Sequence, residues 1–301
     1  MRVATSLQFD RLRDRMGALS NKADALNNQL SSTKRITTPS DDAAGYRALT
    51  ALKRAGANSD AELTNVNLAT SLLDSSATAL ASIESQLSRV KTIAISAGSS
   101  TLSDEQRKSL SAEVDVILED LVRVANTTDA RGTPLFSGDS TATPYVVDGG
   151  GKVTFTGKGE AGQVPIGDGR TIAATTSGQN IFGNIPVKAG GPPSDMFAIV
   201  KAFSDKLKSG APATDDTVDI QAAMTSVVNA QTSIGARGAR LELEKGRLED
   251  LALTREADRS AIEDADIPAT ITELKKVMTV LDATQASFGK LTSLSLFNYL
   301  R

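Results

Sequence analysis

The sequence predicts a mainly α-helical protein: an elongated antiparallel helical bundle or coiled coil built from both termini, with a small inserted β-rich domain. Two observations predict this architecture. Near each end, apolar residues recur in alternating steps of three and four, the spacing that keeps one stripe of a helix against a partner helix. Between residues 138 and 193, glycine, proline and short runs of β-type residues gather instead.

The N-terminal segment is predicted to form a helix over about residues 5–33. Its apolar stripe is narrow, and its other faces carry polar and charged residues. Such a helix gains little by folding alone in water, so it needs a partner in the same chain or in a neighbouring subunit. The stripe consists of Phe9, Leu12, Met16, Leu19, Ala23, Leu26 and Leu30.

A second helix is expected over residues 41–98, after an interruption at Pro39. Ser40 suits its N-cap, and Asp41 and Asp42 then lie in the first turn, where the helix dipole favours acids. The Asp pair also suits a metal site or acid–base chemistry, but no third ligand lies nearby in the sequence. The heptad stripe shifts by one residue on the way: Leu63, Val66, Leu73, Ala77 and Leu80, then Ile83, Leu87, Val90 and Ala94.

A capping box opens the third helix. The Ser103 side chain can accept from the backbone N–H of Gln106, and the Gln106 side chain can reach back to Ser103. We expect this helix to end near residues 129–132 and to form an antiparallel hairpin with the helix before it.

The middle of the chain is predicted to be β-rich. Short β-type runs cover residues 144–147, 152–155, 163–166 and 170–172, and the Asp-Gly pairs at 148–149 and 168–169 are typical of hairpin turns. The glycines near Lys152 do not indicate a phosphate-binding loop, because Val153 follows this lysine where Ser or Thr is needed.

Helix returns after Ser194, a suitable N-cap, and a long helix is expected over about residues 216–258. Gly235 and Gly238 each cost about 1 kcal/mol of helix stability, so we expect another helix backbone to come close to them. The heptad positions of the long helix are Ile220, Val227, Ile234, Leu241 and Leu248.

The C-terminal segment mirrors the first, with Pro268 in the first turn of a helix, and we expect the two terminal helices to pair antiparallel. A rod of two helices leaves some apolar side chains exposed to water. Each of them lacks the stabilisation of about 1.5–3 kcal/mol that burial would provide. Both helices are therefore predicted to be assembly interfaces, and a head-to-tail contact that does not close produces a helical polymer. The C-terminal interface residues are Ile267, Ile271, Leu274, Met278, Leu281, Phe288, Leu291, Leu296 and Phe297.

These elements predict three parts. Residues 1–40 and 262–301 form a terminal coiled-coil domain, residues 41–137 and 194–261 form a helical bundle domain, and residues 138–193 form the inserted β-rich outer domain.

The composition excludes several kinds of function. The chain has no cysteine and no histidine, which excludes disulfides, thiolate or imidazole metal sites and Cys–His catalysis. A net charge of −3 without clustered Lys and Arg argues against nucleic-acid binding. Runs of about 18 apolar residues and a signal-peptide pattern are both missing, so we expect neither membrane insertion nor a cleaved signal. We predict no catalytic residue, cofactor or metal. Because only 4% of the residues are aromatic, we expect cores built from Leu, Ile, Val and Ala.

Several segments resemble the flagellin superfamily of bacterial axial proteins, over residues 1–138 and 194–301. Residues 30–45 are similar to the family stretch Leu-Ser-x-Gly-Lys-Arg-Ile followed by Pro-Ser-Asp-Asp, with Thr33 where glycine is usual. Residues 102–107 and 234–237 also resemble family segments. Residues 1–6, 134–138 and 295–300 are more similar to the branch that joins hook to filament than to filament flagellins.

The resemblance implies a structural subunit of the bacterial flagellum that forms the hook–filament junction by polymerising through its terminal helices. The alternative within the family is flagellin, as a major or minor filament subunit. The implied partners are a second hook–filament junction protein, flagellin, further copies of the chain, and a type III export chaperone at the C-terminal region. The implied location is extracellular, reached through the flagellar type III export apparatus.

Two other classes of function compete with this one. The first is an adhesin or secreted binding module whose β-rich insert holds the ligand. The second is an enzyme with a catalytic insert, but a metalloprotease needs a His-Glu-x-x-His pair and the chain has no histidine. Deleting the insert separates the structural subunit from the binding module, because polymer formation survives the deletion if the helical ends drive it.

Overall fold

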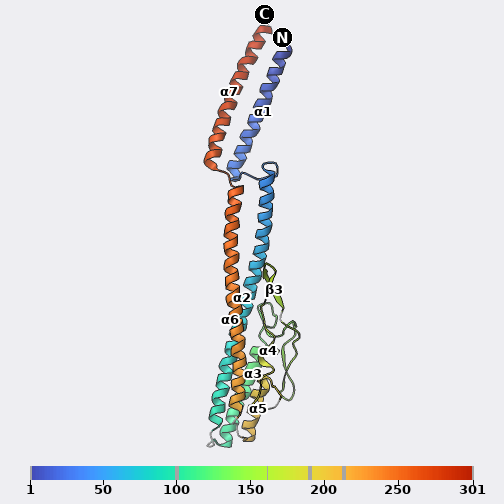
Figure 1. Ribbon diagram of the computed structural model, residues 1–301, viewed down its shortest axis with the longest axis vertical. Helices are drawn as coiled ribbons and strands as arrows, with labels where there is room; N and C mark the ends of the chain where they lie inside the picture. The colour runs from blue at the N-terminus through green and yellow to red at the C-terminus, as the bar shows by residue number, and fades with distance from the viewer. Residues whose placement is uncertain (1, 99–101, 161, 189–191, 212–214, 300–301) are drawn as a thin grey trace. The chain divides into compact units, whose positions relative to one another are not determined.

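Helices dominate the computed structural model and confirm the predicted fold class (Figure 1). The structure describes residues 2–98, 102–160, 162–188, 192–211 and 215–299, without the side chains of residues 2–6, 8 and 291–299. The helices are α1 (Arg2–Ser32), α2 (Ala43–Ala97), α3 (Asp104–Ala125), α4 (Gly178–Phe182), α5 (Met196–Ser209), α6 (Asp216–Glu263) and α7 (Ile267–Tyr299). The strands are β1 (Tyr145–Val147), β2 (Val153–Phe155), β3 (Gln163–Gly167) and β4 (Arg170–Ala173).

The chain divides into two compact units. The first comprises Met1–Asn58 and Asp250–Arg301, and the second comprises Ser59–Glu249. The division falls inside the two longest helices, α2 and α6, rather than at a linker. The finer division into three parts, with an insert over residues 138–193, stays a prediction.

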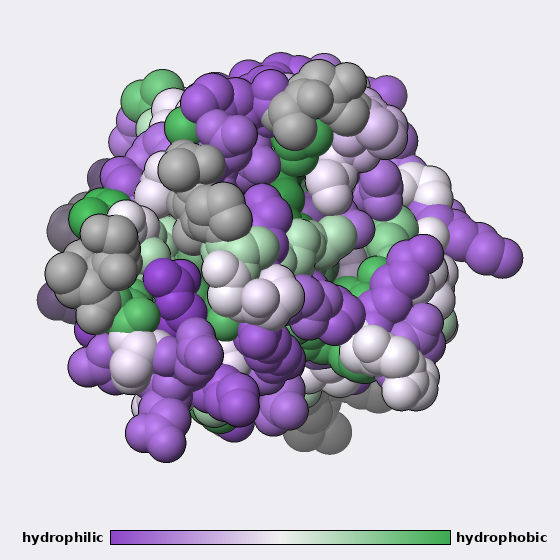
Figure 2. Space-filling model, turned by 90° about the horizontal axis from the view of Figure 1, so that it is seen from below, coloured by the Kyte–Doolittle hydropathy of each residue, from purple (hydrophilic) through white to green (hydrophobic). Residues whose placement is uncertain are grey.

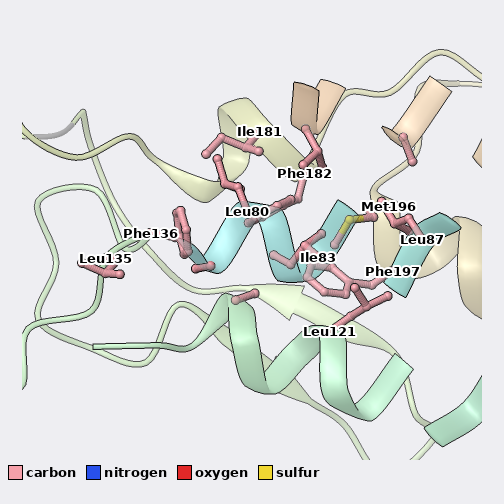
Figure 3. Close-up of a cluster of buried hydrophobic side chains, with 14 of the residues drawn as sticks. Leu80, Ile83, Leu87, Leu121, Leu135, Phe136, Ile181, Phe182, Met196 and Phe197 are labelled. Atoms are coloured by element: carbon pink, nitrogen blue, oxygen red, sulfur yellow. The ribbon is translucent and has the colours of Figure 1, made fainter. Parts of the chain in front are cut away.

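The second unit is built around one apolar core that α2, α3, α5 and α6 share. When the molecule is viewed from the lower end of Figure 1, its surface shows apolar side chains between polar ones (Figure 2). Figure 3 shows Leu80 and Ile83 of α2 in one cluster with Leu121 of α3. The predicted α6 stripe is confirmed, since all five of its positions are buried: Ile220, Val227, Ile234, Leu241 and Leu248.

Four aromatic rings from distant parts of the chain meet in this core. The ring centroid of Phe182 lies 5.5 Å from that of Phe136 and 5.9 Å from that of Phe197. The Tyr145 ring lies 4.8 Å from the Phe197 ring. The prediction of cores built from Leu, Ile, Val and Ala is confirmed for most of this core but is wrong for this cluster. A low aromatic content does not say where the few rings gather.

The predicted capping box of α3 is confirmed. Gln106 N donates to Ser103 Oγ at 3.3 Å, and Ser103 N donates to Gln106 Oε1 at 2.9 Å. The helix ends at Ala125, earlier than predicted, because the Asn126 side chain turns to the first strand. Its amide donates to Tyr145 O and accepts from Tyr145 N, both at 2.9 Å, so it occupies the outer edge of β1.

Both predicted hairpins are confirmed, since β1 pairs antiparallel with β2 and β3 with β4. Asp168 and Gly169 have φ angles of 51° and 70°, the left-handed pair that a two-residue hairpin turn requires. In the other turn, the Asp148 carboxylate accepts from the backbone N–H groups of Gly150 and Lys152. The short helix α4 and the N-cap of α5, which is Asp195 rather than Ser194, were not predicted.

Charged side chains of α6 hold the second hairpin in place. The Arg237 guanidinium donates to the carbonyl oxygens of Ala173 at 2.8 Å and Thr175 at 3.1 Å. Arg170 of β4 forms an ion pair at 2.7 Å with Glu244, whose side chain is 5% exposed. Backbone carbonyls and a buried carboxylate thus fix the hairpin against one face of α6.

Gly235 and Gly238 of α6 do not lie where another backbone of this chain comes close. A Cβ built at Gly235 or Gly238 would meet nothing within 4 Å among the described residues. The expected close helix crossing is not formed within the described chain, because α6 turns Ile234 and Leu241 to the core and leaves these glycines beside that stripe.

Candidate assembly interface

The first unit pairs the two terminal helices, as predicted. α1 and α7 pack along one another and run antiparallel (Figure 1). Ala23 of α1 is buried, and the rings of Phe9 and Phe288 meet edge to face with centroids 5.6 Å apart. The other predicted α1 positions are half-buried in the pair: Leu12, Met16, Leu19, Leu26 and Leu30.

The helix α7 meets α1 through a different register from the one predicted. Thr270 and Val277 are 8% and 4% exposed, whereas Ile271 and Met278 are 40% and 50% exposed. Both sets alternate steps of three and four from the same start, so the repeat alone does not distinguish them. The seam with α1 consists of Ile267, Thr270, Leu274, Val277, Leu281, Thr284 and Phe288.

The outcome for the predicted α7 residues is therefore mixed. Ile267, Leu274, Leu281 and Phe288 are half-buried in the seam. Ile271 and Met278 lie outside it, and their role as assembly contacts stays a prediction. The side chains of the last three predicted residues lie outside the described part of the chain: Leu291, Leu296 and Phe297.

A surface ion pair links the C-terminal half of α1 to the second turn of α7. Lys22 Nζ lies 2.5 Å from Glu273 Oε1, and this hydrogen bond is the main reason why the pKa of Glu273 lies below its ordinary value. Both side chains are more than a third exposed, so the pair contributes only modestly to stability.

The segments that follow α1 and α6 join in a short antiparallel bridge. Arg35 N donates to Glu263 O at 2.7 Å, and Ala265 N donates to Thr33 O at 3.0 Å. The Glu263 side chain is 4% exposed and bonds Lys34 Nζ at 2.6 Å, which lowers its pKa. The two helical connections of this unit are thus fastened to each other by backbone and side-chain bonds.

Thr33 adopts a backbone conformation that threonine rarely takes. Its φ angle is +58°, in the left-handed region, and a β-branched residue there is strained. The bond from Ala265 N to Thr33 O depends on this turn. The structure therefore supplies a physical reason for a glycine at this position.

The turn before α2 is organised by Asp41. Its Oδ2 accepts from the backbone N–H groups of Thr38 at 2.8 Å and Thr37 at 2.9 Å. These two hydrogen bonds lower the pKa of Asp41 to about 2, because they stabilise the ionised carboxylate.

Asp42, not Ser40, caps α2. Asp42 Oδ1 accepts from Ala44 N at 3.1 Å and Gly45 N at 2.9 Å, so the prediction of Ser40 as the cap is wrong by two positions. A Cβ at Gly45 would lie 2.5 Å from Ile36 Cδ1, and Ile36 is 2% exposed. The small residue thus leaves room for an isoleucine that closes the turn over the helix start.

Comparison with known proteins places both helical parts of the chain. Residues 5–141 match the model of the bacterial flagellin N-terminal helical region, and residues 217–300 match that of the C-terminal helical region. The chain belongs to the flagellin family. The predicted resemblance is confirmed, and it covers the terminal helices and the turn at residues 33–45.

This flagellin-family chain is similar to proteins of two branches. It is 24% identical over 319 residues to flagellar hook-associated protein 3 of Escherichia coli, covering 99% of each chain. It is 27% identical over 274 residues to flagellin of Listeria monocytogenes, covering 88% of this chain and 85% of that one. The crystal structure of hook-associated protein 3 from Legionella pneumophila has the same fold, with a TM-score of 0.66 at 17% identity, covering 71% of this chain and 98% of that one.

The length and hydropathy of the helices bear on whether one of them could span a membrane. Among the helices of the described residues, none combines the length and the apolar character that crossing a membrane takes.

Proposed function

We propose that this chain is a hook–filament junction protein of the bacterial flagellum, of the hook-associated protein 3 type. The observation that carries the proposal is the full-length match to hook-associated protein 3, which leaves neither chain with a large unmatched segment. The protein is a structural, extracellular component of the flagellum and not an enzyme.

Assembly uses the terminal helices. The α1–α7 pair leaves apolar side chains outside its seam, with Ile271 and Met278 at 40% and 50% exposure and Val280 at 45%. At 100° per residue, Ile271 and Met278 lie on one flank of the α7 seam and Val280 lies on the opposite flank. A helix with apolar side chains on both flanks of an existing contact can pack between two neighbours, as subunits of a helical polymer require.

The partners follow from this role. The chain assembles with other axial proteins of the flagellum. We propose that these are a second junction protein on the hook side, flagellin on the filament side and further copies of the chain. We also propose that an export chaperone covers the C-terminal region before assembly. The exposed apolar residues on α7 support this, since an unassembled subunit would otherwise present them to water.

Flagellin is the second candidate function. The match to Listeria flagellin over most of both chains favours it. The two functions differ in where the protein lies, because a filament subunit lies along the whole filament and a junction protein occupies a short zone at its base.

Deleting the gene distinguishes the two functions. If the chain is the junction protein, mutant cells retain hooks and release flagellin into the medium, and the restored gene returns the filaments. Gold-labelled antibody against a tagged chain then marks only the base of the filament. Labelling along the filament, or mutant cells that lack filament protein altogether, would establish the flagellin role instead. Mutant cells with normal filaments, together with no labelling of the filament or its base, would contradict both.

A further inference from the structure

A groove in the second unit has no part in the proposed assembly. It lies between the N-terminal turns of α6 and the segment that leads from α4 to Pro186. Its volume of about 670 Å³ lies in the range of small-molecule sites, roughly 300–1,000 Å³. Within the described chain, no acidic or basic side chain lines it. We call it the amide groove, after four of its lining residues: Gln179, Asn180, Asn184 and Asn229.

The carboxamides of these four residues are exposed and unused by the fold. Each offers a hydrogen-bond acceptor and two donors, yet none of the four side chains bonds another described residue. They come from α4, from the segment after it and from α6, so they converge on the groove from both walls. Unpaired carboxamides that converge on one concavity supply polar contacts to a bound molecule.

A fifth carboxamide, that of Gln221, is already oriented. Lys91 Nζ donates to Gln221 Oε1 at 2.6 Å, and an ammonium group cannot accept, so this bond fixes which end of the amide is the oxygen. The Gln221 NH₂ group lies 3.5 Å from Thr225 Oγ1. This side of the groove therefore presents an oriented pair of polar groups.

The two walls are fastened to each other. Ser226 Oγ of α6 donates to Ile181 O of α4 at 2.6 Å. Beyond α4, Ile185 N donates to Ser194 O at 2.8 Å and Ser194 N donates to Ile185 O at 2.9 Å. Walls held by such bonds keep a concave shape without a ligand, which lowers the entropy lost on binding.

We propose that the amide groove binds a neutral polyhydroxylated ligand, such as a short neutral glycan. Two adjacent sugar hydroxyls present a donor and an acceptor side by side, and a carboxamide offers the matching acceptor and donor. Val218, which is 45% exposed, Ala222 and Pro186 provide an aliphatic surface for the C–H face of a sugar ring. A phosphorylated or sulfated ligand finds no Lys or Arg among the lining residues, and the nearby Lys91 ammonium is already bonded to Gln221 Oε1. An extended peptide lacks a strand edge with which to pair.

The test is a titration of the full-length chain with neutral trisaccharides, maltotriose and tri-N-acetylchitotriose, and with the acidic 3′-sialyllactose. Binding is measured by saturation-transfer NMR and calorimetry. The variant Asn180→Asp with Asn229→Asp keeps the shape of both side chains but replaces their donors with negative charge. The matched control is Asn67→Asp, on the exposed face of α2, where the side chain also lacks a described partner.

We expect at least one neutral trisaccharide to bind and the double variant to weaken it by about tenfold or more, because two donors are lost. We expect the control to bind as the unaltered chain does. The proposal is overturned if neither neutral trisaccharide binds, if the double variant binds equally well, if the control loses as much affinity, or if sialyllactose binds more tightly. Capture of an extended peptide by the groove in place of a trisaccharide overturns it as well.

Discussion

Two neighbouring residues of α7 separate the contact inside the subunit from the contact between subunits. Val277 is 4% exposed in the seam with α1, and Met278 is 50% exposed outside it. Replacing each in turn by aspartate puts the same charge at adjacent positions of one helix. Val277→Asp should loosen the terminal pair, and Met278→Asp should leave the pair intact and block assembly.

The magnitudes follow from burial. Burying a valine side chain contributes about 1.5–3 kcal/mol, and Val277→Asp loses nearly all of it. Keeping the new carboxylate in the seam costs several kcal/mol more, of the order found for a buried group without a partner. Half of Met278 is already in water, so the change there is expected to cost the isolated subunit less than about 1 kcal/mol. The two variants should therefore differ by about 2 kcal/mol or more in the stability of the α1–α7 pair.

Hydrogen exchange of the isolated subunit measures the first effect, and motility measures the second. Amides of α1 should exchange faster in Val277→Asp and at the unaltered rate in Met278→Asp. Cells that carry Met278→Asp as their only copy should lose filaments although the subunit is exported. The control is Thr279→Asp, which puts the same charge on an exposed position away from the seam.

Three results would count against the reasoning. Unchanged exchange of α1 in Val277→Asp would mean that the seam does not run through this residue. Normal filaments in Met278→Asp cells would mean that the outer flank of α7 is not an assembly contact. Loss of filaments in Thr279→Asp as well would show that any charge on α7 is harmful and would remove the distinction.

Three further predictions concern stability. Thr33→Gly should raise the free energy of unfolding by about 0.5–1 kcal/mol, because it relieves roughly 1–2 kcal/mol of left-handed strain and part of this gain is offset by the flexibility of glycine in the unfolded chain. Calorimetry checks this prediction against Thr33→Ala, which keeps the strain. Equal stability of the two variants would contradict it. Tyr145→Phe should raise stability by about 1–3 kcal/mol, because the buried Tyr145 Oη lacks a partner among the described residues; a lower unfolding temperature would show that this hydroxyl is bonded. Asp41, whose pKa falls from 3.8 to about 2 on folding, contributes stability above pH 3.8 that is lost as the pH falls toward 2. Measured by thermal unfolding, the Asp41→Asn variant should therefore lose less stability over this pH window than the unaltered chain. Parallel plots of unfolding temperature against pH for the two proteins would contradict the prediction.

Local patterns in the sequence were sufficient for most of the elements. The heptad positions of α6 from Ile220 to Leu248 are buried, and Ser103 caps α3, because each pattern acts within a few turns of one helix. The hairpin turn at Asp168–Gly169 could also be predicted from the sequence, since both residues tolerate positive φ angles. At Ser40 a local pattern misled, because two acids follow the serine and Asp42 makes the bonds of the cap.

The residues of the candidate interface could be predicted only in part from the sequence. Leu274 and Leu281 belong to both possible heptad registers of α7, so their burial did not depend on which register forms. Val277 and Met278 are both apolar and adjacent, and the choice between them depends on where the side chains of α1 stand. A one-dimensional repeat does not contain that information.

The sequence by itself determined the helical class, the two hairpins and the pairing of the chain ends, because amphipathic periodicity and turn chemistry are properties of short segments. Only the tertiary structure decided which face of α7 meets α1, why Gly45 must be small beneath Ile36, and how Phe136, Tyr145, Phe182 and Phe197 come together. These outcomes depend on packing between segments far apart in the chain, where shape and volume, rather than local preference, select one arrangement.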